Sequence, residues 1–217
     1  MKYTTIIFDL DGTLLDTLQD LVDSTNFALA QMNFPIRTAD EVRSFVGNGV
    51  AKLIEKAVPQ GTDEQTVRQT LDVFKEYYAA NCETHTRAYD GILPLLDTLS
   101  QKGLKLAVVS NKIDEAVRVL CKKYFDDYIT LSVGDREGMK RKPAPDSVFE
   151  VLSKLGVNRE DAVYIGDSEV DIMTANNAQI DLICVTWGFR DKEFLLQNGA
   201  TVLVNSAEEL QKLLLSK

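Results

Sequence analysis

The apolar positions of this chain follow two different periods, and the change between them divides the chain into regions. Residues 3–8 form an apolar, β-branched run that predicts a buried strand. From residue 17 to about residue 82, apolar residues recur at helical spacing, and no strand is predicted between residues 15 and 83. Three helix starts are predicted by the capping patterns Thr17-x-x-Asp20, Thr38-x-x-Glu41 and Thr62-x-x-Gln65.

From residue 89 onward, short apolar runs alternate with amphipathic segments. The predicted strands cover residues 104–109, 128–133, 162–165, 182–185 and 202–204. Such alternation is typical of an α/β fold, a doubly wound parallel sheet of Rossmann-like type with helices on both faces. We therefore predict an α/β core made of residues 1–15 and 84–217, into which residues 16–83 are inserted as an all-helical domain.

Polar side chains gather where the predicted strands end, which is where ligands bind in sheets of this kind. They are Asp9, Asp11, Ser110, Asn111, Lys142, Asp167 and Asp171. Two carboxylates at one strand end repel each other unless a cation or a shared proton relieves them. Turns, helix caps and solvated loop charges would explain each residue singly. They do not explain why all of these residues fall at the strand ends of one sheet.

This set of side chains suits phosphoryl transfer through a covalent intermediate. A carboxylate can attack a phosphoryl group that Mg²⁺ polarises, which gives an aspartyl phosphate. Mg²⁺ favours a few carboxylates together with water and the substrate's phosphate, and Asp9 and Asp167 are ligands of that type. A lysine, a hydroxyl and backbone N–H groups can stabilise the charge on the equatorial oxygens.

The same residues carry a resemblance to a known family. Asp9-Leu10-Asp11-Gly12-Thr13, Ser110-Asn111, Lys142-Pro143 and Gly166-Asp167-Ser168 with Asp171 occur in the order of the four motifs of the haloacid dehalogenase superfamily. The chain resembles the branch with a helical cap after the first strand, and within it the phosphoglycolate phosphatases. The resemblance implies a Mg²⁺-dependent phosphatase that acts on a small phosphorylated metabolite.

The resemblance also implies roles for the residues of the first and fourth motifs. Asp9 would be the nucleophile, and Asp11 would protonate the leaving alcohol and then activate water. Mg²⁺ would be held by Asp9, the main-chain carbonyl of Asp11, and Asp167. Thr13 and Asp171 would hold the metal ligands and Lys142 in place without binding the metal themselves. Dehalogenases of the superfamily lack a carboxylate at the position of Asp11, so its presence favours phosphate chemistry.

The remaining motifs would bind the substrate. By the same resemblance, Ser110, Lys142 and the backbone amides of Leu10 and Asn111 would contact the phosphoryl oxygens. In the helical insert, the segment with Gly47 and Asn48 resembles the family's specificity loop. Arg43 beside it could bind a substrate carboxylate, although it could equally be a solvated helix charge.

The overall composition narrows the classes of partner. A net charge of −9 and a pI near 4.7 argue against general binding of nucleic acid or of an anionic membrane surface. The sequence has no apolar run of membrane-spanning length and no signal-peptide pattern, so we expect a cytoplasmic protein. Scattered cysteines favour a reducing compartment, and a single histidine makes a Ser-His-Asp triad improbable. The sequence does not indicate an oligomeric state.

Other functions share these residue types. Within the superfamily, the alternatives are a pyrophosphatase, a sugar-phosphate or nucleotide phosphatase, and a phosphoglucomutase. From another class, a receiver-type signalling module also uses a phosphorylated aspartate, an acidic pocket and a lysine on a doubly wound sheet. Such a module needs no insert of ~67 residues, a length atypical of a connection between elements.

Overall fold

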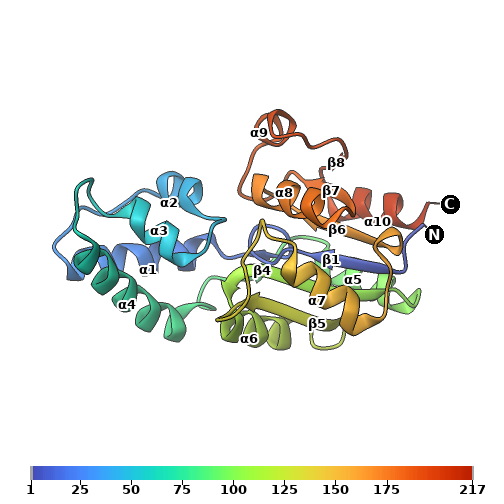
Figure 1. The fold of residues 1–217 in the computed structure, drawn as a ribbon, viewed down its shortest axis with the longest axis horizontal. Coiled ribbons are helices and arrows are strands. Elements are labelled where there is room, and N and C mark those ends of the chain that lie inside the picture. Colours follow the sequence, from blue (N-terminus) through green and yellow to red (C-terminus); the bar gives the residue numbers. More distant parts are fainter. Residues whose placement is uncertain (1, 217) are drawn as a thin grey trace. The chain divides into compact units, whose positions relative to one another are not determined.

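In the computed structural model, which describes residues 2–216, the chain divides into two compact units (Figure 1). The first unit runs up to Leu15 and resumes at Ala88, and the second is Asp16–Arg87. The first unit holds the predicted sheet and the second holds the helical insert.

The sheet of the first unit has six strands in the order β5-β4-β1-β6-β7-β8. The strands are β1 Thr5–Phe8, β4 Lys105–Ile113, β5 Ile129–Asp135, β6 Ala162–Gly166, β7 Asp181–Val185 and β8 Leu203–Val204. Every neighbouring pair is parallel, and β1 lies between β4 and β6. The predicted doubly wound α/β sheet is confirmed. The strand order reverses beside β1, which places the end of β1 where such folds bind ligands.

Helices cover both faces of this sheet. Ile6 and Phe8 of β1 share one core with α5 Ile92–Gln101, α6 Asp114–Phe125 and α10 Ala207–Leu215. Ile7 faces the other core, with α7 Asp146–Leu155 and α8 Glu169–Ala178. This alternation follows from the two-residue period of a strand, and burial on both faces explains why three of the four residues of β1 are apolar. A short helix, α9 Lys192–Gln197, precedes β8.

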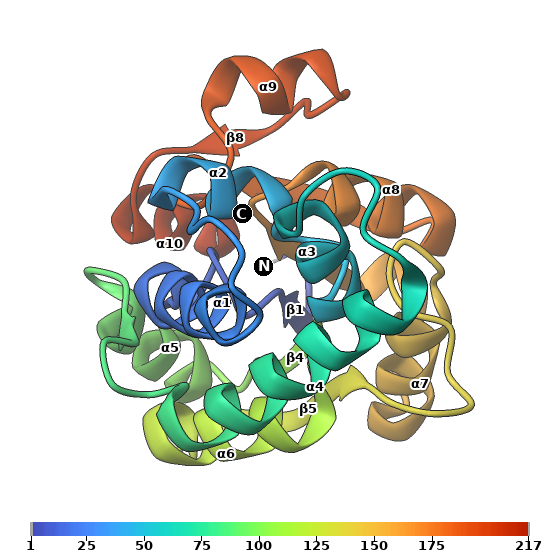
Figure 2. The ribbon, with the colours of Figure 1, turned by 90° about the vertical axis from the view of Figure 1, so that its left-hand side faces the viewer.

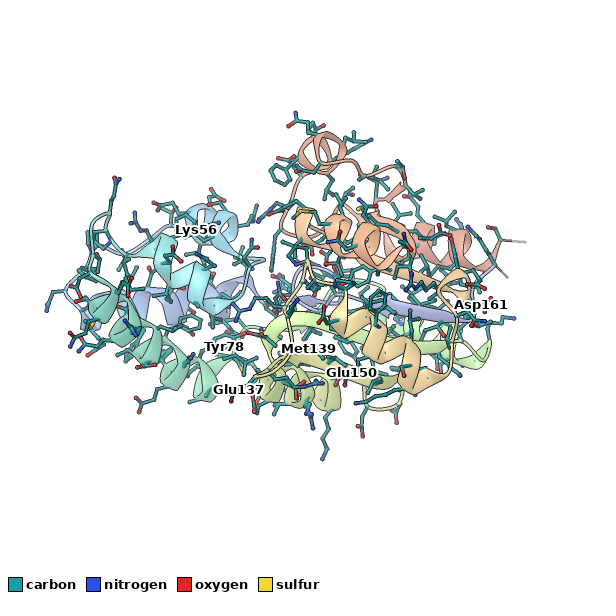
Figure 3. The ribbon with its side chains drawn as sticks, in the orientation of Figure 1. Lys56, Tyr78, Glu137, Met139, Glu150 and Asp161 are labelled. Atoms are coloured by element: carbon teal, nitrogen blue, oxygen red, sulfur yellow. The ribbon has the colours of Figure 1, made fainter. Side chains whose placement is uncertain are left out.

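The second unit is a four-helix cluster with a core of its own (Figure 2). Its helices are α1 Leu18–Gln31, α2 Ala39–Phe45, α3 Val50–Ala57 and α4 Glu64–Asn81. Tyr78 of α4, labelled in Figure 3, is one of the aromatic residues buried in this core. Among the helices that the structure describes, none combines the length and the apolarity needed to cross a membrane.

Two of the three predicted helix caps in this unit are wrong. The capping box of Thr38 and Glu41 is present. Asp63, not Thr62, caps α4 by accepting from the Thr66 backbone N–H, so that pattern was placed one residue early. Thr17 precedes α1 but its side chain makes no capping hydrogen bond.

Asp20, predicted to complete the Thr17 cap, instead binds the chain as it leaves the unit. Its buried carboxylate accepts hydrogen bonds from the His85 N–H at 2.8 Å and from the Thr86 N–H at 2.9 Å. This contact explains why the unit extends to Arg87, beyond the predicted limit at residue 83. The short paired strands β2 Leu15–Asp16 and β3 Arg87–Ala88 were also not predicted.

Strand β4 is longer than predicted. It continues past Val109 to Ile113, with a shift in its pairing with β5 between those two residues. Ser110, Asn111 and Lys112 therefore belong to the strand, although the predicted strand ends at Val109. Polar side chains are tolerated there because all three are buried against other groups of the site described below.

Candidate active site

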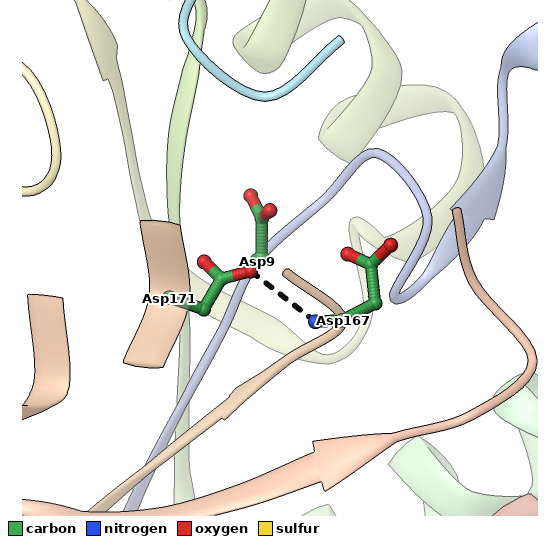
Figure 4. A group of neighbouring side chains, drawn as sticks. All are labelled: Asp9, Asp167 and Asp171. Carbon is green, nitrogen blue, oxygen red and sulfur yellow. Dashed lines mark hydrogen bonds between the residues drawn. The ribbon is translucent and has the colours of Figure 1, made fainter. Parts of the chain in front are cut away.

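Three buried carboxylates meet at the carboxyl ends of β1 and β6 (Figure 4). The parallel pairing of Phe8 with Ile165 brings Asp9 beside Asp167, and the start of α8 adds Asp171. Oxygens from the three side chains all lie within 4.8 Å of one another. The structure thus brings together carboxylates that are far apart in the sequence.

Asp171 is occupied by hydrogen bonds within the protein. Its Oδ2 accepts from the Ser168 hydroxyl at 2.7 Å and from the backbone N–H groups of Ser168 and Asp167, the latter drawn in Figure 4. Its Oδ1 accepts from Lys142 at 2.8 Å. We therefore assign Asp171 to holding Lys142 and the start of α8. Asp9 and Asp167 are the better candidates for binding a metal.

Lys142 is the cation of this group. Its Nζ lies 3.0 Å from Oδ1 of Asp9 and 2.9 Å from the Tyr164 hydroxyl, and its side chain is 2% exposed. The Asn111 side-chain amide donates to the Lys142 main-chain carbonyl at 3.0 Å, which anchors the loop that carries the lysine. Sequence reasoning missed Tyr164, because it reads as one more apolar residue of a buried strand.

The single positive charge of Lys142 does not balance the three buried carboxylates of Asp9, Asp167 and Asp171. Burial and the neighbouring charge of Asp171 raise the pKa of Asp9 to about 7, although Lys142 acts in the opposite direction. Burial, with Asp171 and Asp9, raises the pKa of Asp167 well above its usual value. Burial alone would lower the pKa of Lys142, but Asp171 and Asp9 raise it well above its usual value. A divalent cation between Asp9 and Asp167 would relieve this repulsion, so the donor set fits one.

The main chain lies close to the carboxylate of Asp167. Its carboxylate accepts from the Thr13 hydroxyl at 3.1 Å and from the Phe189 N–H at 2.7 Å. A Cβ at Gly12 would lie 2.3 Å from Oδ2 of Asp167, and one at Gly188 would lie 2.4 Å from the same atom. Both glycines are therefore required sterically. The Phe189 amide is a second group that sequence reasoning missed, since a backbone donor leaves no signature in residue type.

Asp11 lies in the turn after β1 and faces a different lysine. Nζ of Lys112 is 2.8 Å from Oδ1 of Asp11, and the side chains are 2% and 15% exposed, respectively. Hydrogen bonds from Gly12 N–H to the Leu15 carbonyl and from the Leu14 N–H to the Leu10 carbonyl hold the turn. The sequence alone indicates no role for Lys112.

The predicted phosphate-binding groups have partners inside the protein. The Leu10 N–H donates to Oδ1 of Asp9 at 2.7 Å, and the Ser110 hydroxyl accepts from the Lys112 N–H at 3.3 Å. A phosphoryl group that binds to the Leu10 N–H and the Ser110 hydroxyl would therefore have to replace these internal hydrogen bonds. Ser110 and Asn111 both lie on β4, in the same unit as the carboxylates.

The predicted specificity residues belong to the second unit. Arg43 lies on α2, and Gly47 and Asn48 lie in the connection between α2 and α3. Gly47 has a φ of 119°, a conformation that favours glycine. Their part in substrate choice stays a prediction.

Comparison with known proteins adds an independent observation. The sequence profile of the haloacid dehalogenase-like hydrolases matches residues 6–185. The chain is 34% identical to the phosphoglycolate phosphatase of Aquifex aeolicus (strain VF5), over 85% of both chains. It is 33% identical to that of Mannheimia succiniciproducens, over 87% of this chain and 88% of the relative. A crystal structure from Lactobacillus delbrueckii subsp. bulgaricus, provisionally assigned as a phosphoglycolate phosphatase, matches with a TM-score of 0.95 at 41% identity and covers 100% of each chain.

Proposed function

The chain belongs to the haloacid dehalogenase-like hydrolase family, and on that basis we propose that it is a Mg²⁺-dependent phosphatase acting on small phosphate monoesters. The observation that carries the proposal is the buried cluster of Asp9, Asp167 and Lys142 at the carboxyl edge of the sheet. Phosphoglycolate is the first substrate to test, because relatives that the chain covers over most of their length bear that name.

Asp9 is the proposed nucleophile. Its carboxylate attacks the phosphorus atom, the bond to the ester oxygen breaks, and an aspartyl phosphate forms. Lys142, held by Asp171 and Tyr164, lies where it can neutralise charge on the transferring group. When bound, Mg²⁺ would be held by Asp9, Asp167 and the Asp11 carbonyl, and would supply polarisation of the phosphoryl group.

Asp11 is the proposed acid and base. It gives a proton to the departing alkoxide, and the resulting carboxylate then takes a proton from the water that attacks the phosphorus atom of the intermediate. Water attack releases inorganic phosphate and restores Asp9. No group outside the first unit is needed for these steps.

The helical unit is the proposed cap. The core residues named above all act on the phosphoryl group or its immediate neighbours, so they leave recognition of the rest of the substrate to other residues. Arg43, Gly47 and Asn48 are the candidates, and a cationic Arg43 would suit the carboxylate of a phosphoglycolate-like ester.

The test is a panel of phosphate compounds assayed with and without Mg²⁺, including phosphoglycolate, sugar phosphates, nucleoside monophosphates and pyrophosphate. We expect Mg²⁺-dependent release of inorganic phosphate, with phosphoglycolate among the best substrates. Turnover of several esters would also distinguish an enzyme from a phosphoaspartate switch. Absence of turnover for every ester would contradict the proposal.

Binding of Mg²⁺ should depend on pH, because the pKa of Asp9 is raised to about 7. Below that value Asp9 is increasingly protonated, and Mg²⁺ must displace the proton. We expect the affinity for Mg²⁺ to weaken as pH falls from 8 to 6, by up to about tenfold per pH unit, with proton release on binding. Calorimetric titration in buffers of different ionisation enthalpy measures both quantities. A constant affinity without proton release would contradict this assignment of Asp9.

A further inference from the structure

A second buried lysine in the first unit has no place in the chemistry above. Lys112 lies near the end of β4, its side chain is 2% exposed, and its Nζ is 2.8 Å from Oδ1 of Asp11. Lys142 contacts Asp9 and Asp171 instead. Each lysine therefore pairs with different carboxylates of the first unit.

The strands explain why the Asp11 pair forms. β1 and β4 are parallel neighbours, with Phe8 opposite Val108. Beyond this pair of residues, β1 leads into the turn that carries Asp11, whereas β4 continues as a strand to Ile113. Lys112 therefore reaches Asp11 from within β4, and a strand is a more rigid support than a loop.

The contact with Lys112 restrains the Asp11 side chain. Asp11 lies on a turn two residues after Asp9, and the negative charges of these two carboxylates repel each other. The ammonium group of Lys112 attracts Oδ1 at hydrogen-bond distance, and this contact leaves Oδ2 as the oxygen that can exchange a proton. Burial strengthens the contact, since few water molecules can compete for the lysine.

We propose that Lys112 is a positioning residue that fixes the Asp11 carboxylate in the orientation needed for proton transfer to the leaving group. This inference rests on the proposed function. It assigns Lys112 to the protonation step and not to binding of the phosphoryl group.

Leaving-group chemistry separates this role from a structural one. 4-Nitrophenolate leaves without a proton, whereas the alkoxide of phosphoglycolate needs one. The value of kcat/KM reports only the steps up to departure of the leaving group, so later hydrolysis of the intermediate does not affect it. Loss of Asp11 positioning should therefore reduce kcat/KM for phosphoglycolate far more than for 4-nitrophenyl phosphate.

The experiment compares Lys112→Met, and in parallel Lys112→Gln, with Asp11→Asn on both esters. We expect each Lys112 variant to lose about 10- to 100-fold in kcat/KM for phosphoglycolate and less than about 3-fold for the aryl ester. Adding Lys112→Met to Asp11→Asn should cost little more for phosphoglycolate, since both act on one step. A crystal structure of Lys112→Met should show the Asp11 carboxylate displaced.

Lys105→Met is the matched control, because Lys105 lies at the other end of β4 and donates to the Leu155 carbonyl. It should leave the ratio of the two kcat/KM values unchanged. Equal losses for both esters, additive effects with Asp11→Asn, or an unmoved Asp11 would overturn the inference alone. A wild-type chain that hydrolyses neither ester would overturn the proposed function and the inference with it.

Discussion

Asp9→Asn should abolish phosphatase turnover, lowering kcat by about 10⁴-fold or more, because an amide cannot form the aspartyl phosphate. The loss should be the same for alkyl and aryl esters, since both need the nucleophile. Steady-state release of inorganic phosphate measures it. Mass spectrometry must exclude deamidation of the new asparagine, and substantial turnover in the intact variant would contradict the assignment of Asp9.

The same variant should keep its fold. The raised pKa of Asp9, about 7, means that the folded protein disfavours the charged carboxylate. This cost is absent at pH values below the usual aspartate range and is fully present above pH 7. Removing the charge should therefore leave the metal-free protein at least as stable as wild type at pH 8, as measured by thermal unfolding. Asp181→Asn, at an exposed position of β7, is the matched control for activity.

Lys142→Met should damage both activity and stability. Removing this buried cation leaves Asp9 and Asp171 facing each other without it, and loss of one partner from a buried ion pair costs about 3–5 kcal/mol. Loss of a group that stabilises the transferring phosphoryl should lower kcat/KM by about 10²–10³-fold. Urea unfolding of the metal-free protein and initial-rate kinetics measure the two effects.

Lys140→Met provides the comparison for this variant, because Lys140 is exposed in the same loop. Its effect on the free energy of unfolding should stay within about 0.5 kcal/mol. If Lys142→Met were equally harmless, the network around Asp171 would not depend on its cation. The role proposed for Lys142 would then be wrong.

The fold was largely predictable because its two cores impose regular patterns. Buried parallel strands are mostly apolar, and the helices that cover them are amphipathic, so both leave a pattern in the sequence. Two of the errors fall where a side chain bonds to a distant segment. Asp20 resembles a capping residue, but it binds the backbone of His85 and Thr86. The polar residues Ser110 to Lys112 led the predicted strand to end at Val109, yet they continue β4.

The candidate site was predictable only where residue type and strand ends coincide. Asp9, Lys142 and Asp167 met that condition, and the structure brings them together. Lys112 and Asp11 are 101 positions apart, and nothing local marks them as a pair. Tyr164 and the Phe189 amide were missed for a similar reason, since their contribution depends on which face of a strand or loop the fold presents.

The insertion point of the helical unit has an evolutionary consequence. Each unit closes on itself there: the Tyr89 N–H donates to the Leu14 carbonyl at 3.1 Å in the first unit, and Arg87 pairs with Asp16 at 3.1 Å in the second. The chain thus leaves and re-enters each unit at adjacent residues. A segment joined in this way can be exchanged as a cassette without rerouting the chain that carries the carboxylates. Under the roles proposed for the two units, reaction chemistry and substrate preference would then be encoded in separate stretches of the gene.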